Sequence, residues 1–373
     1  MKKTNEQKNK QGKLKSILKI ICIILLGIII IPTVILFIVR GVNSIRFRLK
    51  DGVQEKIYIQ LSSAEQFINI RGRNIENPVV IWLHGGPGGP DTFFTTTFQQ
   101  ELESDFTFIR WDQRGCGRTY YKSRDLSLSW DAFLADLDEL VDYAASRFNQ
   151  PIILVGHSWG SALGSTYAAE HPEKIAGYVG IGQFTDDHES EKLAAEKSEE
   201  MARTAGNDIE AEKIKELYQS YTSTGLTSEN ADLKGFLQFR QLTASYLSPN
   251  DKDPILTALV SPDFGWNDLR WNLRILTNME GFLASNRELF TDLEDFELPY
   301  SFEVPVILIQ GENDYVCSTV LAEKYQQSLS APISEIFIMK ELGHGPMFDD
   351  PDAFADVLKK AFDLIVEKGA VKE

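Results

Sequence analysis

The stretch PIILVGHSWGSALGSTYAAE, residues 151–170, decides the fold. Residues 151–155 form a short apolar run, which is typical of a strand in a sheet covered on both faces. The pattern G-x-S-x-G follows at residues 156–160, and residues 161–170 predict a helix. A strand, a sharp turn and a helix in this order lift a serine above the sheet, so Ser158 is predicted to be a catalytic nucleophile.

Similar apolar runs lie on both sides of this stretch, at residues 56–61, 65–70, 79–83, 106–111, 175–181, 306–309 and 335–339. Segments with helical spacing, such as residues 133–148 and 351–366, separate several of them. This alternation predicts an α/β fold with a mostly parallel, doubly wound sheet. Residues 183–299 interrupt the alternation and are helix-prone and acidic. We therefore expect a core of residues 56–182 and 300–373 with a helical insertion between two strands.

A serine nucleophile needs a base and an acid that orients the base. His344 lies between two glycines after the last predicted strand, which favours it as the base. Asp314 follows the strand at residues 306–309 and is the favoured acid, with Glu312 as the alternative. His157 directly precedes the nucleophile, and its side chain is expected to point away from the site.

The N-terminal segment predicts a membrane anchor. Residues 1–19 are basic, and residues 20–39 are almost continuously apolar. Twenty helical residues span about 30 Å, the thickness of a bilayer core. A cleaved signal peptide would have a shorter apolar region and a small-residue cleavage site. Residues 40–55 are expected to be a linker. The basic excess before the span predicts a single-pass protein whose body lies outside the cytoplasm.

Charge and cysteine content exclude other classes of protein. The chain has a net charge of −16, although residues 1–50 hold eleven basic residues and one acid. The remaining residues hold 27 basic and 53 acidic side chains, a net of −26. A body this acidic repels phosphate backbones, so nucleic-acid binding is not expected. Three cysteines without a Cys/His cluster predict neither a disulfide framework nor a metal site.

Five motifs together resemble the proline iminopeptidase group of α/β-hydrolases. They are HGGPGG at 84–89, WDQRGCGRT at 111–119, GHSWGSALG at 156–164, GENDYVC at 311–317 and GHG at 343–345. The resemblance implies an α/β-hydrolase fold in which Ser158, Asp314 and His344 form the triad and residues 183–299 form a cap. Backbone N–H groups of Gly86 and Trp159 are then expected to form the oxyanion hole, with Gly85 as an alternative.

The resemblance also implies that cap glutamates bind the free α-amine of a peptide, and Glu280 is the candidate here. Two departures are the N-terminal anchor and His157, where these enzymes commonly have glycine. The sequence thus predicts a cofactor-free, membrane-anchored serine hydrolase acting on a small peptide as an aminopeptidase. An esterase or lipase-like enzyme with the same triad is the alternative, because one scaffold can host many chemistries. A binding protein built on an inactive hydrolase is disfavoured by the intact Ser, Asp and His.

Overall fold

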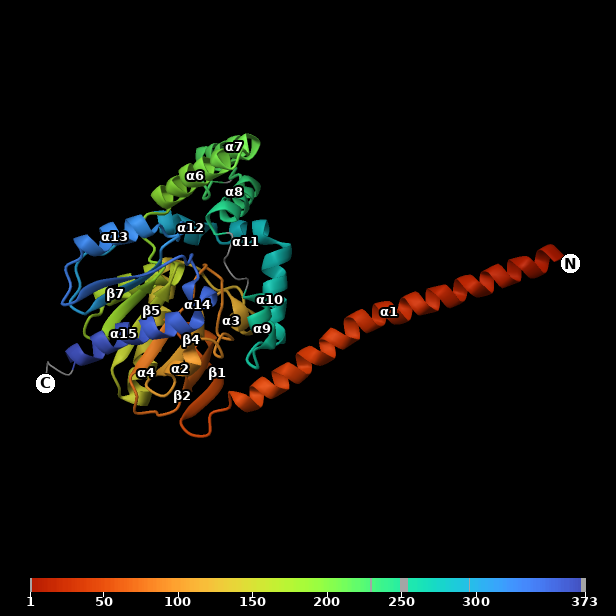
Figure 1. Ribbon diagram of the computed structural model, residues 1–373. Helices are drawn as coiled ribbons and strands as arrows, with labels where there is room; N and C mark the ends of the chain where they lie inside the picture. Colours follow the sequence, from red (N-terminus) through yellow and green to blue (C-terminus); the bar gives the residue numbers. More distant parts are fainter. Residues whose placement is uncertain (1, 229, 249–253, 295, 370–373) are drawn as a thin grey trace.

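A central sheet organises the molecule (Figure 1). The computed structural model describes residues 2–228, 230–248, 254–294 and 296–369. Within them the strand order is β1-β2-β4-β3-β5-β6-β7-β8. Strand β2 is antiparallel to β1 and β4, and the other neighbours pair in parallel, so the predicted mostly parallel sheet is confirmed. The strands are β1 (Val53–Leu61), β2 (Ala64–Gly72), β3 (Val79–Leu83), β4 (Thr107–Asp112), β5 (Ile152–His157), β6 (Gly177–Ile181), β7 (Val306–Gly311) and β8 (Ser334–Met339).

Two apolar cores cover the two faces of the sheet. Alternate residues of β3 point to opposite faces, so that Ile81 belongs to one core and Trp82 to the other. Helices α4 (Trp130–Phe148), α5 (Trp159–Glu170) and α13 (Thr319–Ser328) pack on the first face. Helices α2 (Gln99–Leu102) and α15 (Pro351–Gly369) pack on the second. Because both faces are buried, the central strands need continuous apolar runs, which is the pattern that the sequence shows.

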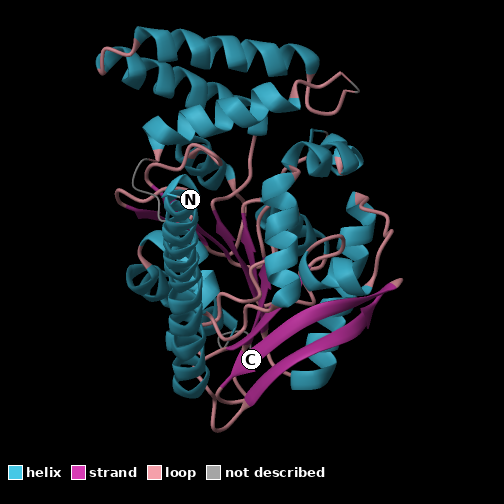
Figure 2. Cartoon of the chain, turned by 90° about the vertical axis from the view of Figure 1, so that its right-hand side faces the viewer, coloured by secondary structure: helices cyan, strands magenta, loops and turns pink. Residues whose placement is uncertain are grey.

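Seven further helices of the described residues connect β6 to β7. Helices α6, α7 and α8 share a small apolar core of their own and stand above the sheet (Figures 1 and 2). Helices α9, α10 and α11 follow along one side of the body, and α12 leads back toward β7. Their bounds are α6 (Asp187–Thr204), α7 (Asp208–Thr224), α8 (Leu233–Leu247), α9 (Ile255–Val260), α10 (Trp266–Thr277), α11 (Met279–Ser285) and α12 (Arg287–Glu294). Helices α3 (Gly117–Lys122) and α14 (Pro346–Asp349) complete the description.

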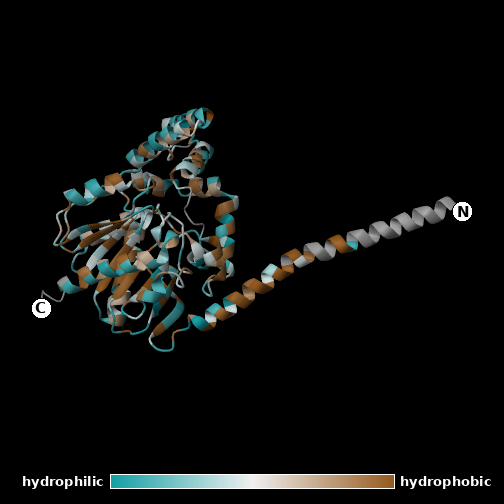
Figure 3. Ribbon diagram, viewed as in Figure 1, coloured by the Kyte–Doolittle hydropathy of each residue, from teal (hydrophilic) through white to brown (hydrophobic). Residues whose placement is uncertain are grey.

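The N-terminal helix α1 (Lys2–Arg46) extends away from the body. Its part from Lys19 to Arg46 is long and apolar enough to cross a membrane, a property that a signal sequence shares. Figure 3 shows hydrophobic residues along the part of α1 nearer the body.

The structure corrects the expected linker at residues 40–55. Helix α1 continues to Arg46, and β1 already begins at Val53. The helix persists because side chains of its last turns bind the body. Arg40 Nη1 donates to the Leu259 carbonyl at 3.0 Å, and Asn43 Nδ2 donates to the Val260 carbonyl at 2.9 Å.

Candidate active site

Ser158 occupies a strained turn between β5 and α5. Its backbone has φ 54° and ψ −123°, a conformation that residues other than glycine rarely adopt. The two flanking glycines are sterically required. A Cβ at Gly156 would lie 2.2 Å from the Gly160 carbonyl oxygen, and a Cβ at Gly160 would lie 2.4 Å from the Leu83 carbonyl oxygen. Strain held in place by such packing is typical of functional sites, and this geometry presents the Ser158 side chain at the start of α5.

Asp314 and His344 meet at the neighbouring strand ends. The His344 Nδ1 atom lies 2.9 Å from Asp314 Oδ2. The other carboxylate oxygen of Asp314 accepts hydrogen bonds from the backbone N–H groups of Val316 and Cys317, each at 2.9 Å. The alternative acid, Glu312, is exposed and instead accepts a hydrogen bond from the Glu341 N–H at 2.9 Å. The structure therefore places Asp314, and not Glu312, against His344.

Ser158 and His344 line one cavity at the carboxyl ends of the parallel strands. Gly182, just after β6, lies beside the pair: a Cβ there would come within 3.1 Å of His344 Nδ1 and 3.2 Å of Asp314 Oδ2. The fold thus gathers the three predicted triad residues at one sheet edge.

The glycine-rich turn after β3 lies against the serine from the other side. A Cβ at Gly85 would lie 3.2 Å from the Ser158 Cβ, and Gly86 adopts φ +133°. Gly85, Gly86 and Trp159 all line the cavity with Ser158. The Trp159 N–H is at the N-terminus of α5, where the helix dipole is positive. Gly86 and Trp159 therefore stay the predicted oxyanion donors.

His157 does not point away from the site, contrary to expectation. Its ring lies 5.0 Å from the His344 ring, and its Nε2 lies 3.0 Å from the His344 backbone oxygen. Burial first, and then the positive charge of His344, lower the pKa of His157 to about 4. A neutral His157 therefore donates from Nε2 to the His344 carbonyl and helps to fix the loop that carries this residue. Sequence reasoning missed this contact because residue 157 precedes the serine in a strand, where alternation suggests opposite directions.

The predicted position of Glu280 is a further correction. Glu280 is exposed in the first turn of α11 and is not among the residues that line the cavity, because the side chains of Met279 and Phe282 face inward instead. The carboxylates that do line the cavity are Asp186, Asp187, Glu191 and Glu297, besides Asp91.

Glu191 is the most perturbed of the cavity carboxylates. It is 3% exposed, and Tyr221 donates a hydrogen bond of 2.6 Å to its Oε2. Burial first, and then the negative charge of Asp187, raise its pKa to about 7. Arg240 Nη1 lies 3.8 Å from the other oxygen and acts in the opposite direction. No group of His, Cys, Asp and Glu side chains that could hold a metal ion occurs among the residues that the structure describes.

The cavity measures about 1620 Å³, which exceeds the roughly 300–1,000 Å³ of ordinary small-molecule sites. Most of its walls are apolar and come from the helices between β6 and β7. Helix α6 contacts the loop that follows Asp314, because the Ser318 N–H donates to Ser190 Oγ of α6 at 3.2 Å. The arrangement offers a nucleophile, a base with its acid, donors for an oxyanion, and a large space with both apolar and acidic walls.

A serine elbow at the carboxyl edge of a parallel sheet, with histidine and acid on the following loops, defines the class of protein. The chain belongs to the alpha/beta hydrolase family, whose model matches residues 80–357, and it is a hydrolase enzyme. Within this family it is similar to the proline iminopeptidase group. The probable aminopeptidase YbaC of Bacillus subtilis (strain 168) is 26% identical over 320 residues, which cover 81% of this chain and 94% of that protein.

Solved structures show the same fold. A proline iminopeptidase-related protein from Thermus thermophilus matches with a TM-score of 0.51 and 19% identity, over 85% of this chain and 99% of its own. A membrane phospholipase A matches with a TM-score of 0.54 and 17% identity, over 95% of this chain and 99% of its own. At these identities the likeness establishes the α/β-hydrolase fold that the sequence predicts.

Proposed function

We propose that Ser158 attacks the carbonyl of an N-terminal residue of a peptide, which makes the protein an aminopeptidase. His344 takes the serine proton and passes it to the leaving amine, while Asp314 holds the imidazole in the tautomer that accepts at Nε2. The N–H groups of Gly86 and Trp159 stabilise the oxyanion. Water then attacks the acyl-enzyme, again with His344 as base, and releases the free amino acid. The observation that carries the hydrolytic mechanism is the 2.9 Å contact between His344 and Asp314 beside the strained Ser158.

The preference for peptides rests on the acidic wall of the cavity and on the aminopeptidase name of the relative. Asp187 and Glu191 are one helical turn apart on α6 and both line the cavity. Burial first, and then the negative charge of Asp187, raise the pKa of Glu191, whereas the positive charge of Arg240 lowers it. A cationic α-amine bound there would replace the repulsion between the two acids with attraction. We therefore assign to Glu191 and Asp187 the amine-binding role that the sequence analysis expected of Glu280.

The alternative is an esterase or lipase-like enzyme. The apolar walls favour it, because Leu259, Leu269 and Phe290 have no evident use in binding a short peptide. The same triad would then cleave an uncharged ester.

The proposed location is the cell membrane, with α1 as a single span. Seven lysines precede the apolar segment, whereas four basic residues follow it before residue 51. This bias favours a cytoplasmic N-terminus and a catalytic body on the outer side. Protease added to spheroplasts should then degrade the body, and complete protection of the body would contradict this orientation.

A substrate panel separates the two activities. Aminoacyl-arylamides, including the prolyl derivative, are compared with their N-acetylated forms and with short-chain aryl esters. An aminopeptidase should lose most activity on acetylation, because losing one partner of a buried charge pair costs about 2–5 kcal/mol, or roughly 30- to several-thousand-fold. The Glu191→Gln variant should reduce the difference in hydrolysis rate between the free and the acetylated substrates. Glu280→Gln, which changes an exposed residue outside the cavity, is the matched control. Equal rates on free and acetylated substrates would favour the esterase.

A further inference from the structure

Apolar side chains are exposed to solvent along α9 and α10. The five members are between 48% and 77% exposed: Ile255, Leu256, Trp266, Leu273 and Leu276. Those on α10 share one side of the helix at 3.6 residues per turn, while Asp268 and Trp271 on the other side are buried. Exposed apolar patches of this kind often mark surfaces that bind a partner or a membrane. We refer to these five residues, with Arg270 and Arg274 between them, as the α9–α10 face.

The exposed charge of the α9–α10 face is positive. Arg270 and Arg274 are exposed and stack over tyrosine rings of α3 at 4.1 and 5.1 Å. The two acids of the same stretch, Asp263 and Asp268, are buried and ion-paired. The positive charge of this face contrasts with residues 51–373 as a whole, which carry a net charge of −26. A helix with tryptophan and leucine beside arginine on its exposed side is typical of a surface that binds anionic lipid.

The position of α1 sets the depth of this face. Arg40 directly follows the apolar segment, and its guanidinium donates to the carbonyl of Leu259 in the last turn of α9 and to that of Phe264 between α9 and α10. Asn43 holds the Val260 carbonyl and lies only about 5 Å further along the helix from Arg40. The headgroup layer of a leaflet is about 5–8 Å deep. If the apolar segment fills the bilayer core, the loop between α9 and α10 therefore lies among the headgroups.

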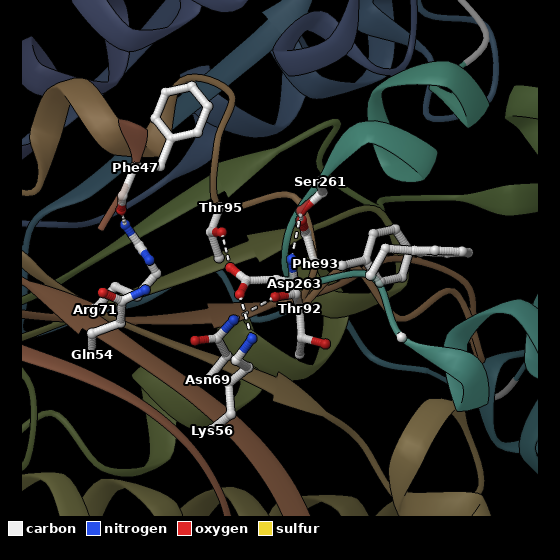
Figure 4. Close-up of polar contacts among 12 residues, drawn as sticks. Phe47, Gln54, Lys56, Asn69, Arg71, Thr92, Phe93, Thr95, Ser261 and Asp263 are labelled. Atoms are coloured by element: carbon white, nitrogen blue, oxygen red, sulfur yellow. Dashed lines mark hydrogen bonds and ion pairs between the residues drawn. The ribbon is translucent and has the colours of Figure 1, made fainter. Parts of the chain in front are cut away.

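Hydrogen bonds tie the α9–α10 loop and the end of α1 to the body (Figure 4). Asp263 in the α9–α10 loop accepts a hydrogen bond of 2.7 Å from Lys56 of β1 and another from Thr95. The neighbouring strand β2 holds the chain just after α1, because Arg71 Nη2 donates to the Phe47 carbonyl at 2.8 Å. Figures 1 and 2 show α10 on the side of the body from which α1 leaves.

The active-site cavity opens at the same face. Ile255, Leu273 and Leu276 line the cavity that holds Ser158, and yet they are 57%, 48% and 77% exposed. These three residues therefore form part of the cavity's rim. An apolar rim at headgroup depth would admit the chain of an amphiphile without passing that chain through water.

We propose that the α9–α10 face rests on the anionic lipid surface and that the cavity draws its substrate from the bilayer. The substrate class is an acyl-chain-bearing ester or amide whose polar end reaches Ser158. This inference rests on the proposed membrane span and the proposed serine hydrolase.

The first test measures depth with the full chain reconstituted in vesicles that contain phosphatidylglycerol and brominated lipid. Of the described tryptophans, Trp266 is 70% exposed and Trp130 is half-buried, whereas Trp82, Trp111, Trp159 and Trp271 are buried. Bromine should quench the fluorescence of the native chain, and most of this quenching should be missing in Trp266→Phe. Equal quenching in both chains would overturn the proposal. Alkaline extraction of the same vesicles tests the span separately. If the chain resists extraction while Trp266 is not quenched, the proposed span is supported and the proposed contact of the α9–α10 face with lipid is refuted.

The second test concerns the substrate. Leu256→Glu places a charge on the face without touching the cavity lining, and Val320→Glu is the matched control on α13, where Val320 is 51% exposed. Hydrolysis of a long-chain ester embedded in anionic vesicles should fall roughly tenfold in Leu256→Glu, because a charge at an interfacial apolar face weakens its insertion. Hydrolysis of a short water-soluble ester should be unchanged in both variants. Equal loss on the two esters, or no loss on either, would contradict entry from the bilayer. If the native chain hydrolysed no ester or amide, the proposed serine hydrolase mechanism would be refuted. The quenching test would still show whether the α9–α10 face contacts lipid.

Discussion

Replacing Asp314 with asparagine tests the proposed triad at a single atom. Oδ1 of Asp314 accepts two backbone N–H groups, so in Asp314→Asn the amide oxygen must take that place. The NH2 group then faces His344 Nδ1 in the position that Oδ2 has in the native chain. A donor at this point forces Nδ1 to accept, and the ring proton moves to Nε2, the atom that has to accept the proton of Ser158.

The expected loss follows from this tautomer. Where the same exchange fixes the wrong tautomer in a serine protease, kcat falls about ten-thousand-fold. At 1.36 kcal/mol per decade this is a barrier increase of ~5 kcal/mol. The shape of the side chain is unchanged, so the folded structure should persist.

The assay is steady-state hydrolysis of an aryl ester and an aminoacyl-arylamide, with thermal unfolding measured beside it. Glu312→Gln is the matched control, since Glu312 is two residues away and is exposed. Its kcat should remain within about twofold of the native value, as is usual for surface substitutions. If Asp314→Asn kept near-native kcat, or if Glu312→Gln were the more damaged variant, the assignment of the acid would be wrong.

Three other outcomes are expected. Ser158→Ala should abolish labelling by a fluorophosphonate while thermal unfolding remains cooperative, and a labelled variant would refute the nucleophile. In His157→Leu the His344 carbonyl loses its donor, so kcat should fall roughly tenfold with KM little changed, and His157→Gln should restore part of it. Because the folded-state pKa of Glu191 is about 7 against an ordinary 4.5, stability should fall as pH rises from 4.5 to 7, by about 3 kcal/mol at most. Glu191→Gln should remove this slope, and KM of the native enzyme for a free-amine substrate should fall between pH 6 and 8 as the carboxylate ionises.

The sheet and the proposed triad could be predicted because each depends on local sequence. Buried parallel strands require unbroken apolar runs, and the elbow at Ser158 requires glycines whose absence would cause backbone clashes. Asp314 and His344 follow such strands directly, so the topology brings them to one edge without long-range packing. Their places in the chain were enough to propose them as acid and base.

The cavity wall could not be predicted in this way. Whether Glu191 or Glu280 lines the cavity depends on how α6 and α11 pack, and no local motif distinguishes the two residues. Leu256 and Trp266 look like core residues in sequence, but packing leaves them 74% and 70% exposed. The direction of a side chain on a cap helix is set by distant partners, and no local motif records it.

The unbroken helix between Val39 and Arg46 makes the number of residues there matter more than their identity. An insertion in a flexible tether would change only its reach. In a helix, each added residue turns everything beyond it by about 100° and advances it by about 1.5 Å. One residue inserted before Arg40 would swing the catalytic body around the axis of α1, whereas four would pass a full turn by about 40° and nearly restore its heading. The length of this helical segment therefore sets the orientation of the catalytic body relative to the proposed span. Substitutions in the segment should be tolerated better than insertions or deletions.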